Sequence, residues 1–191
     1  MQPIGPLMIE HRLIERLLHQ MQREFRRIKD NIAVDPEFAF VDPVFIDAAV
    51  DFIRTYADRC HHGKEEDILF KALAAKELSP EHRQIMAELL REHVWARETT
   101  AALVKAKEGY LLEKPGALDD LMQHLEKLVE FYPQHIDKED KHFFTPCLAY
   151  FSAEEKAALL AQMYEFDRLL IHEKYRGLVE GIENRRGCKT C

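Results

Sequence analysis

Hydrophobic positions recur with a helical period along most of the chain. From about Leu7 to about Ile28, apolar side chains return every three or four residues, which predicts an amphipathic helix with one buried face. His11 lies on the apolar line of this helix and not on its polar flank. The same spacing predicts four further helices, at about 43–75, 79–109, 118–150 and 152–187.

Residues typical of helix N-termini mark where three of these helices begin. A capping side chain stands before a proline at Asp42-Pro43 and Ser79-Pro80, and Ser152 with Glu155 forms a capping box. The sequence therefore predicts an all-α fold. We expect residues 1–150 to form an antiparallel up-and-down four-helix bundle, and residues 151–191 to add a C-terminal covering helix and tail to the same domain.

Each of the first four predicted helices carries a histidine on its apolar face. In two of them a glutamate follows four residues later, a spacing that places both side chains on the same side of a helix. The inward polar positions are His11, His61, Glu65, His93, His135 and Glu139. By the same helical spacing His62 and Glu66 fall on a polar face, so we expect His62 to point outward or to support a neighbour from behind.

A single inward histidine is usually a hydrogen-bonded core residue, and the remaining histidines are assigned to the surface: His19, His82, His124 and His142. Six inward groups shared among four helices favour a metal site instead. Without an ion, each buried carboxylate would carry a desolvation cost of several kcal/mol. Imidazole together with carboxylate suits iron, manganese or zinc.

Composition narrows the classes of partner. The 191 residues include 27 basic and 34 acidic side chains, giving a net charge of −7, which argues against a nucleic-acid partner. No window is long and apolar enough for a membrane span, and the N-terminus lacks the pattern of a signal peptide. We therefore expect a cytoplasmic protein. Cys60 and Cys147 are expected to be buried, and Cys188 and Cys191 form a C-terminal C-x-x-C without a thioredoxin context.

Two segments carry a resemblance to a known family. The stretches HHGKEEDILF, from His61, and HIDKEDKHFF, from His135, together with a histidine on each of the other two helices, resemble the hemerythrin-like (HHE cation-binding) domains. The resemblance covers about residues 8–150. It implies a four-helix bundle that holds a non-haem di-iron centre, oxo- or hydroxo-bridged, with zinc or manganese as possible substitutes. The four histidines would be terminal ligands, and Glu65 and Glu139 would bridge both ions.

The chain departs from the oxygen-carrying members of that family at two points. Those proteins have His-x-x-x-His on the third helix, whereas here Arg97 follows His93 at that spacing, which leaves one ligand position for water, substrate or another side chain. His172, Glu173 or Tyr175 of the fifth helix are alternatives for that position, although a plain covering helix is favoured. Those proteins also take their last carboxylate at His-x-x-x-x-Asp, which Asp140 matches, whereas Glu139 matches the spacing of Glu65 and is chosen by that symmetry. Asp140 stays the alternative, because Pro133 is expected to kink the helix or shift its register just before His135.

The resemblance predicts a protein that binds, senses or handles O2, NO, peroxide or iron, with a small diatomic molecule or peroxide as its partner. The alternative is a di-iron oxidoreductase for peroxide or nitric-oxide detoxification or iron-centre repair. A zinc or structural metal bundle is the third hypothesis. Nothing in the sequence identifies a protein partner.

Overall fold

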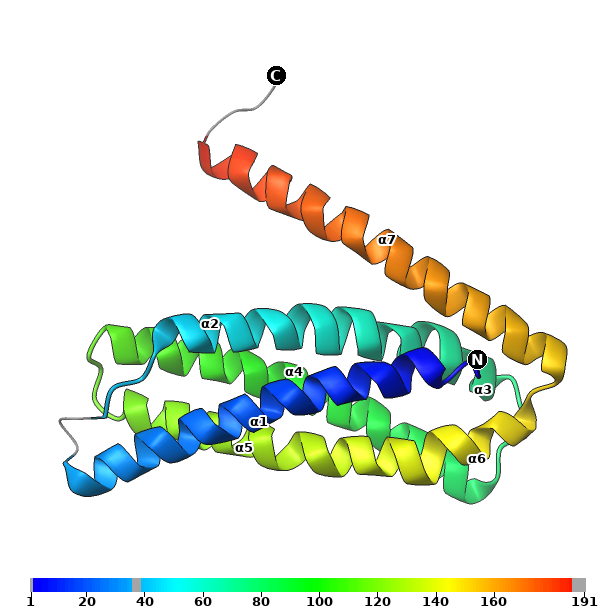
Figure 1. Cartoon of the computed structure of the whole chain (residues 1–191), viewed down its shortest axis with the longest axis horizontal. Coiled ribbons are helices and arrows are strands. Elements are labelled where there is room, and N and C mark those ends of the chain that lie inside the picture. The colour runs from blue at the N-terminus through cyan, green and yellow to red at the C-terminus, as the bar shows by residue number, and fades with distance from the viewer. Residues whose placement is uncertain (1, 36–38, 187–191) are drawn as a thin grey trace.

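The computed structural model describes the backbone of residues 2–35 and 39–186, and the side chains of these residues up to residue 170. Four rods run alternately up and down, and α7 (Ala153–Arg186) follows them (Figure 1). The first rod is α1 (Gly5–Val34), and the third is α4 (Pro80–Leu111). The predicted all-α bundle with an extra C-terminal helix is confirmed.

The second and fourth rods change their winding along their length. The second consists of α2 (Pro43–Phe52), η2 (Ile53–His62), η3 (Glu65–Phe70) and α3 (Lys71–Ala74). The fourth consists of α5 (Ala117–Asp137), η4 (Lys138–Phe144), α6 (Thr145–Cys147) and η5 (Leu148–Tyr150). The segments η2, η3 and η4 are π-helical, which means that their hydrogen bonds join residues five apart and their turns are wider than those of an α-helix. Such wide turns are frequent at functional sites.

The predicted N-terminal caps of the helices are present. The Asp42 carboxylate accepts hydrogen bonds from the backbone N–H groups of Val44 and Phe45, and Ser79 Oγ accepts one from His82 N. In the capping box, Glu155 N donates to Ser152 Oγ, and Ser152 N donates to the Glu155 carboxylate. Each cap satisfies backbone donors that the first helical turn leaves unpaired.

Pro133 does not act where the sequence predicted. The α-helical winding of α5 continues through Pro133 to Asp137, and the wide turns begin at Lys138, after His135 and not before it. The expected change of register therefore exists, but it lies after His135.

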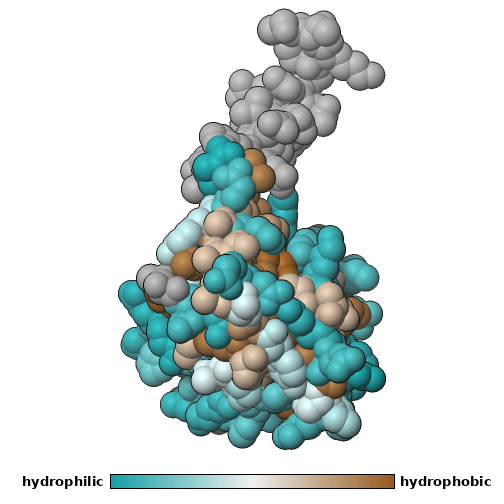
Figure 2. All heavy atoms as spheres, turned by 90° about the vertical axis from the view of Figure 1, so that its right-hand side faces the viewer, coloured by the Kyte–Doolittle hydropathy of each residue, from teal (hydrophilic) through white to brown (hydrophobic). Residues whose placement is uncertain are grey.

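Two apolar clusters fill the bundle on either side of a polar centre. One contains Leu121, Leu125 and Leu128 of α5, and the other contains Leu69 of η3 and Phe143 and Phe144 of η4. Viewed from the end where α7 begins, the surface is largely hydrophilic, with hydrophobic residues between the polar ones (Figure 2). In the part of the chain that the structure describes, no helix is long and apolar enough to cross a membrane.

The covering helix α7 packs on η2 and η3. A Cβ atom added at Gly63 would lie 2.8 Å from Cζ of Phe166 on α7, so the glycine permits this close approach. Beside it, the buried Lys64 Nζ donates to Asp167 of α7 at 2.6 Å and to Glu10 of α1. The first turns of α7 are thereby fixed to two rods, while its later turns diverge from the bundle (Figure 1).

Candidate metal centre

The six side chains predicted to face inward meet between the two apolar clusters. All six are at most 2% exposed: His11, His61, Glu65, His93, His135 and Glu139. They come from α1, η2, η3, α4, α5 and η4, so every rod of the bundle contributes. The structure brings all the predicted positions together.

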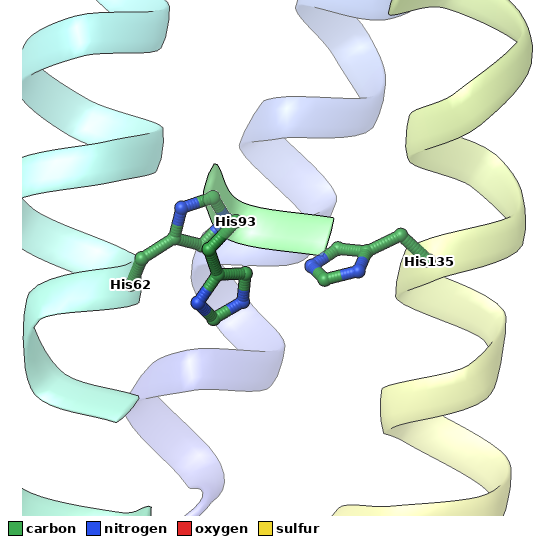
Figure 3. A group of neighbouring side chains, drawn as sticks. All are labelled: His62, His93 and His135. Atoms are coloured by element: carbon green, nitrogen blue, oxygen red, sulfur yellow. The ribbon is translucent and has the colours of Figure 1, made fainter. Parts of the chain in front are cut away.

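His62 is a seventh member, and its predicted outward orientation is wrong. It is 1% exposed, and its ring stacks on that of His93 with 3.9 Å between the centroids and an interplanar angle of 8°. His62, His93 and His135 place one ring nitrogen each within 4.8 Å of one another. Figure 3 shows these side chains converging from η2, α4 and α5. We call them the three-histidine group.

The physical reason is the π-helical winding of η2 and η3. A wider turn rotates each successive residue by a smaller angle than an α-helix does, so adjacent residues can both face the core. The face assignment from the sequence assumed regular α-helical spacing. His61 and His62 therefore both point inward, and η2 places the imidazole of His62 beside that of His93 on α4.

The other ligand-type atoms form a second group. His11, His61, Glu65 and Glu139 each place a nitrogen or oxygen within 4.8 Å of the others, and we call His11 and His61 the two-histidine group. The rings of His11 and His61 lie 4.5 Å apart. Phe144 stacks on His11 with 5.7 Å between the centroids.

Both glutamates lie between the two groups of histidines. Glu65 Oε1 is 3.2 Å from His61 Nε2, while its Oε2 is 3.3 Å from His93 Nε2. Glu139 Oε2 is 3.2 Å from His11 Nε2, while its Oε1 is 3.3 Å from His135 Nε2. Each carboxylate thus offers one oxygen to each side, which is the arrangement of a bridging ligand.

The inward-facing atoms lack hydrogen bonds. Among the described side chains, the buried nitrogen and oxygen atoms without a partner include Nε2 of His11, His61, His93 and His135 and both carboxylate oxygens of Glu65 and Glu139. Their separations of 3.2 and 3.3 Å match the spacing of about 3 Å between neighbouring ligands that each lie about 2.1 Å from one ion. Buried carboxylates without partners are costly, and cations would offset that cost. The residues present therefore fit a metal centre.

An outer ring of carboxylates fixes the opposite nitrogen of each imidazole. Glu10 of α1 lies 2.9 Å from His61 Nδ1, and Glu66 of η3 lies 2.7 Å from His93 Nδ1. Continuing around the bundle, Glu92 of α4 lies 2.8 Å from Nδ1 of His135 on α5, and Asp140 of η4 lies 2.8 Å from Nδ1 of His11 on α1. A carboxylate of each rod therefore contacts a histidine of the next rod. Such contacts orient a metal-binding imidazole and set its tautomer.

Basic side chains balance this ring in turn. Arg12 pairs with Asp140 at 2.5 Å, Lys64 pairs with Glu10, and Lys138 pairs with Glu92. Arg97 pairs with two carboxylates: its Nε donates to Asp58 at 2.7 Å, and its Nη2 donates to Glu66 at 2.7 Å. Asp58 also contacts His62 Nδ1 at 3.3 Å. The arginine that replaces a histidine at this position therefore holds the carboxylates behind His62 and His93.

Without metal, the buried histidines and glutamates strongly affect one another's pKa values. Burial lowers the pKa of His61, but Glu65 and Glu10 outweigh burial and raise it to about 10. Burial likewise lowers the pKa of His93, yet Glu139 and Glu66 raise it to about 9. Burial raises the pKa of Glu139, whereas the surrounding histidines hold it well below its usual range. Without metal, protons on His61 and His93 therefore supply positive charge that an ion would otherwise carry.

A comparison with protein families agrees with this geometry. Residues 2–147 match the model of the hemerythrin HHE cation-binding domain. The chain belongs to this family. Comparisons with curated proteins and with solved structures gave no match. The hemerythrin HHE domain binds metal cations, and the buried histidine and glutamate groups are positioned to hold them.

Within this hemerythrin HHE domain, Glu139 and Asp140 contact the histidines from different sides. Glu139 is fully buried between the two groups, whereas Asp140 contacts Nδ1 of His11 from outside. The wide turns of η4 allow these adjacent residues to serve the centre from two sides. Assignment of Glu139 as a metal ligand stays a prediction, as it does for the other five side chains.

Sequence reasoning missed the inward position of His62 and the supporting role of the carboxylates of the outer ring. A signal existed, because each of the four ring carboxylates adjoins an inward residue: Glu10 precedes His11, Glu92 precedes His93, Glu66 follows Glu65, and Asp140 follows Glu139. The side chains proposed as alternative ligands on the fifth helix, and the C-terminal cysteines, lie outside the described residues: His172, Glu173, Tyr175, Cys188 and Cys191.

A further group of possible ligands is explained without an ion. Glu10, Cys60 and Asp167 lie close together, but the ammonium group of Lys64 already contacts both carboxylates. Cys60 Sγ donates to Asp167, and burial raises the pKa of the Cys60 thiol to about 12. Cys60 and Cys147 are both buried, as predicted.

Proposed function

We propose that this chain is a cytoplasmic non-haem di-iron protein that binds or handles dioxygen, nitric oxide or peroxide. The proposal rests on the eight buried ligand atoms that lack hydrogen-bond partners among the described residues. Four of them are histidine nitrogens in two groups, and four are the oxygens of the two carboxylates between these groups, an arrangement suited to two cations.

Three histidines would hold one ion and two would hold the other, with Glu65 and Glu139 shared. Five imidazoles and two carboxylates leave room for exogenous ligands on six-coordinate ions. When bound, iron would supply reversible redox chemistry and an open position for a small ligand. The apolar clusters shield the centre on two sides, because Leu69, Phe143 and Tyr132 are fully buried in them.

The outer ring of carboxylates acts on the imidazoles of the histidines rather than on a bound small molecule. Each Nδ1 of the proposed terminal histidines faces an acid that is itself paired with a basic side chain. This keeps Nε2 directed at the ion and raises the basicity of the imidazole. The chain thereby favours stable retention of the metal.

An oxidoreductase is the second candidate, and a cavity beside His62 supports it. That cavity has a volume of about 300 Å³, more than a diatomic molecule needs, so a larger reactant can approach the three-histidine group. Catalytic turnover and reversible binding of a small molecule can be distinguished by one experiment.

The metal-free protein is loaded with ferrous iron without oxygen, and the iron bound per chain is measured. Two ions per chain are expected, with an absorption change on exposure to air. A stable and reversible spectrum supports a binding protein, whereas rapid consumption of added peroxide supports the oxidoreductase. Failure to bind iron, with tight binding of zinc and no spectral change, would overturn the di-iron proposal.

A further inference from the structure

The buried centre needs a route for electrons if its ions are to change their redox state repeatedly. The six predicted ligands are at most 2% exposed, so a reductant outside the bundle cannot touch the ions. The cavity beside His62, of about 300 Å³, admits small molecules but not a carrier of the size of a protein. An electron from such a carrier must therefore tunnel through side chains, and tunnelling is faster through atoms in contact than across gaps.

A chain of aromatic rings leads from the centre to the surface. The ring of Phe131 on α5 stacks on that of His135, with 5.2 Å between the centroids and an interplanar angle of 25°. Phe131 also contacts the indole of Trp95 on α4, with 4.5 Å between the centroids. Both separations are those of aromatic rings in direct contact. Trp95 is 36% exposed, so this chain of rings ends at the solvent.

The other phenylalanine contacts of the predicted ligands lead into the interior. Phe144, which stacks on His11, is fully buried. The contacts that begin at His93 pass through Phe70 and Phe143, which are both buried, before they reach a partly exposed ring. Among the described residues, the path through Phe131 is therefore the shortest chain of ring contacts from the centre to an exposed aromatic side chain.

We propose that Trp95 is the point at which a one-electron carrier exchanges electrons with the metal centre, by way of Phe131 and His135. The proposal rests on the proposed function, because it needs a redox-active ion. For each ferric ion that is reduced, the carrier loses one electron and the ion becomes ferrous. Phe131 bridges the tunnelling path and is itself neither oxidised nor reduced.

The chemistry of indole makes this path measurable in the opposite direction. Trp95 is the single tryptophan of the chain, and indole is among the side chains most easily oxidised by one electron. The dibromide radical anion takes that electron and becomes two bromide ions, while the oxidised indole releases a proton to solvent. A ferrous ion of the centre can then return one electron, so that the indole regains its proton and the ion becomes ferric.

Pulse radiolysis in bromide solution tests the path on protein loaded with ferrous iron in the absence of oxygen. The absorption of the tryptophanyl radical at Trp95 is followed with time. We expect it to decay severalfold faster in the ferrous protein than in the zinc-loaded protein, at a rate independent of protein concentration. Equal decay in the two forms would overturn the proposal.

Phe131→Leu removes the bridging ring but keeps an apolar side chain. Its matched control is Phe45→Leu in α2, because Phe45 is also partly buried against the same apolar cluster. Decay of the radical in the ferrous protein, compared at equal iron content, should slow severalfold in Phe131→Leu and stay unchanged in Phe45→Leu. Unchanged decay in Phe131→Leu would show that electrons do not use this ring.

A second variant tests the surface end of the path without the radical. Reduction of the air-oxidised protein by a reduced ferredoxin, a carrier too large for the cavity, should be severalfold slower in Trp95→Leu than in Tyr164→Leu, which removes an exposed aromatic side chain of α7. Equal rates would contradict the role of Trp95. Iron content is measured on every sample. A chain that binds no iron would overturn the di-iron proposal and this path together, whereas iron-loaded variants with unchanged rates would refute only the path.

Discussion

The two halves of the metal centre follow one scheme but differ in their surroundings. In both, a carboxylate supports each imidazole from outside and a basic side chain supports that carboxylate. The two-histidine group is closed: Phe144 stacks on His11, and the support behind His61 passes through the buried Lys64 to α7. The three-histidine group instead adjoins a cavity.

This difference assigns separate tasks to the two sides. Lys64 is fully buried and joins three elements, so we expect the closed side to contribute to stability as well as to metal retention. Arg97 is 39% exposed and supports two carboxylates beside the cavity, so we expect an external molecule to reach the centre from this open side. The same kind of supporting ring is therefore expected to favour metal retention on one side and access on the other.

Loss of a shared carboxylate should have the largest effect, because it affects both sides at once. Glu139→Ala removes oxygens that face His11 on one side and His135 on the other. We expect iron content to fall from two ions per chain to less than one, measured by elemental analysis after loading. The exposed Glu130→Ala on α5 is the control and should retain both ions. Full occupancy in Glu139→Ala would show that the carboxylate does not bridge.

Loss of one histidine should affect one side only. His62→Ala should cost about one ion per chain, as His61→Ala should on the other side, because both imidazoles face the core. The measurement is again iron per chain, with the exposed His142→Ala as control. Retention of both ions in His62→Ala would mean that this buried imidazole is not a ligand.

The supporting cations should separate retention from stability. Lys64→Met leaves two carboxylates without their shared buried cation and should lower the free energy of unfolding by about 3 kcal/mol. Arg97→Met should lower it by less than about 1 kcal/mol, because this side chain is partly exposed. Its main expected effect is on metal affinity at the open side, a decrease of about tenfold. Urea denaturation and competition with a chelator measure the two quantities. Equal loss of stability in both variants would remove the proposed contrast.

The stability of the metal-free protein should also depend on pH. In the metal-free protein the pKa of His61 is about 10 and that of His93 is about 9, both above the unfolded value. Folding therefore takes up protons above about pH 6.5, and the associated stability is fully present below that pH and lost as pH rises toward 10.

Metal ions displace those protons, so metal affinity should rise across the same range of pH. Calorimetry at pH 7.5 in two buffers of different ionisation enthalpy should show release of about two protons per chain on filling the centre. Release should diminish as the pH approaches 10. Metal binding without proton release at pH 7.5 would contradict the charge state given to the two imidazoles.

Several features of this fold are readable in the sequence because they depend on short-range rules. Helix starts at Pro43, Pro80 and Ala153 follow from capping side chains next to the first turn. The gathering of His11, His93 and Glu139 in one core follows from their place on apolar stripes. A helix with one apolar face must bury it, and any polar group on that face is buried with it.

Tertiary structure alone decided the winding of the second and fourth rods and the ring of support around the centre. The π-helical turns of η2 bring His62 inward, and a fixed helical period cannot anticipate a change of period. The partner of each imidazole lies on a neighbouring rod, as Glu10 does for His61, so it depends on how the rods pack and not on spacing within one helix. Local sequence determined most of the groups that are buried, whereas the winding of η2 added His62 to them and packing between helices determined which of them meet.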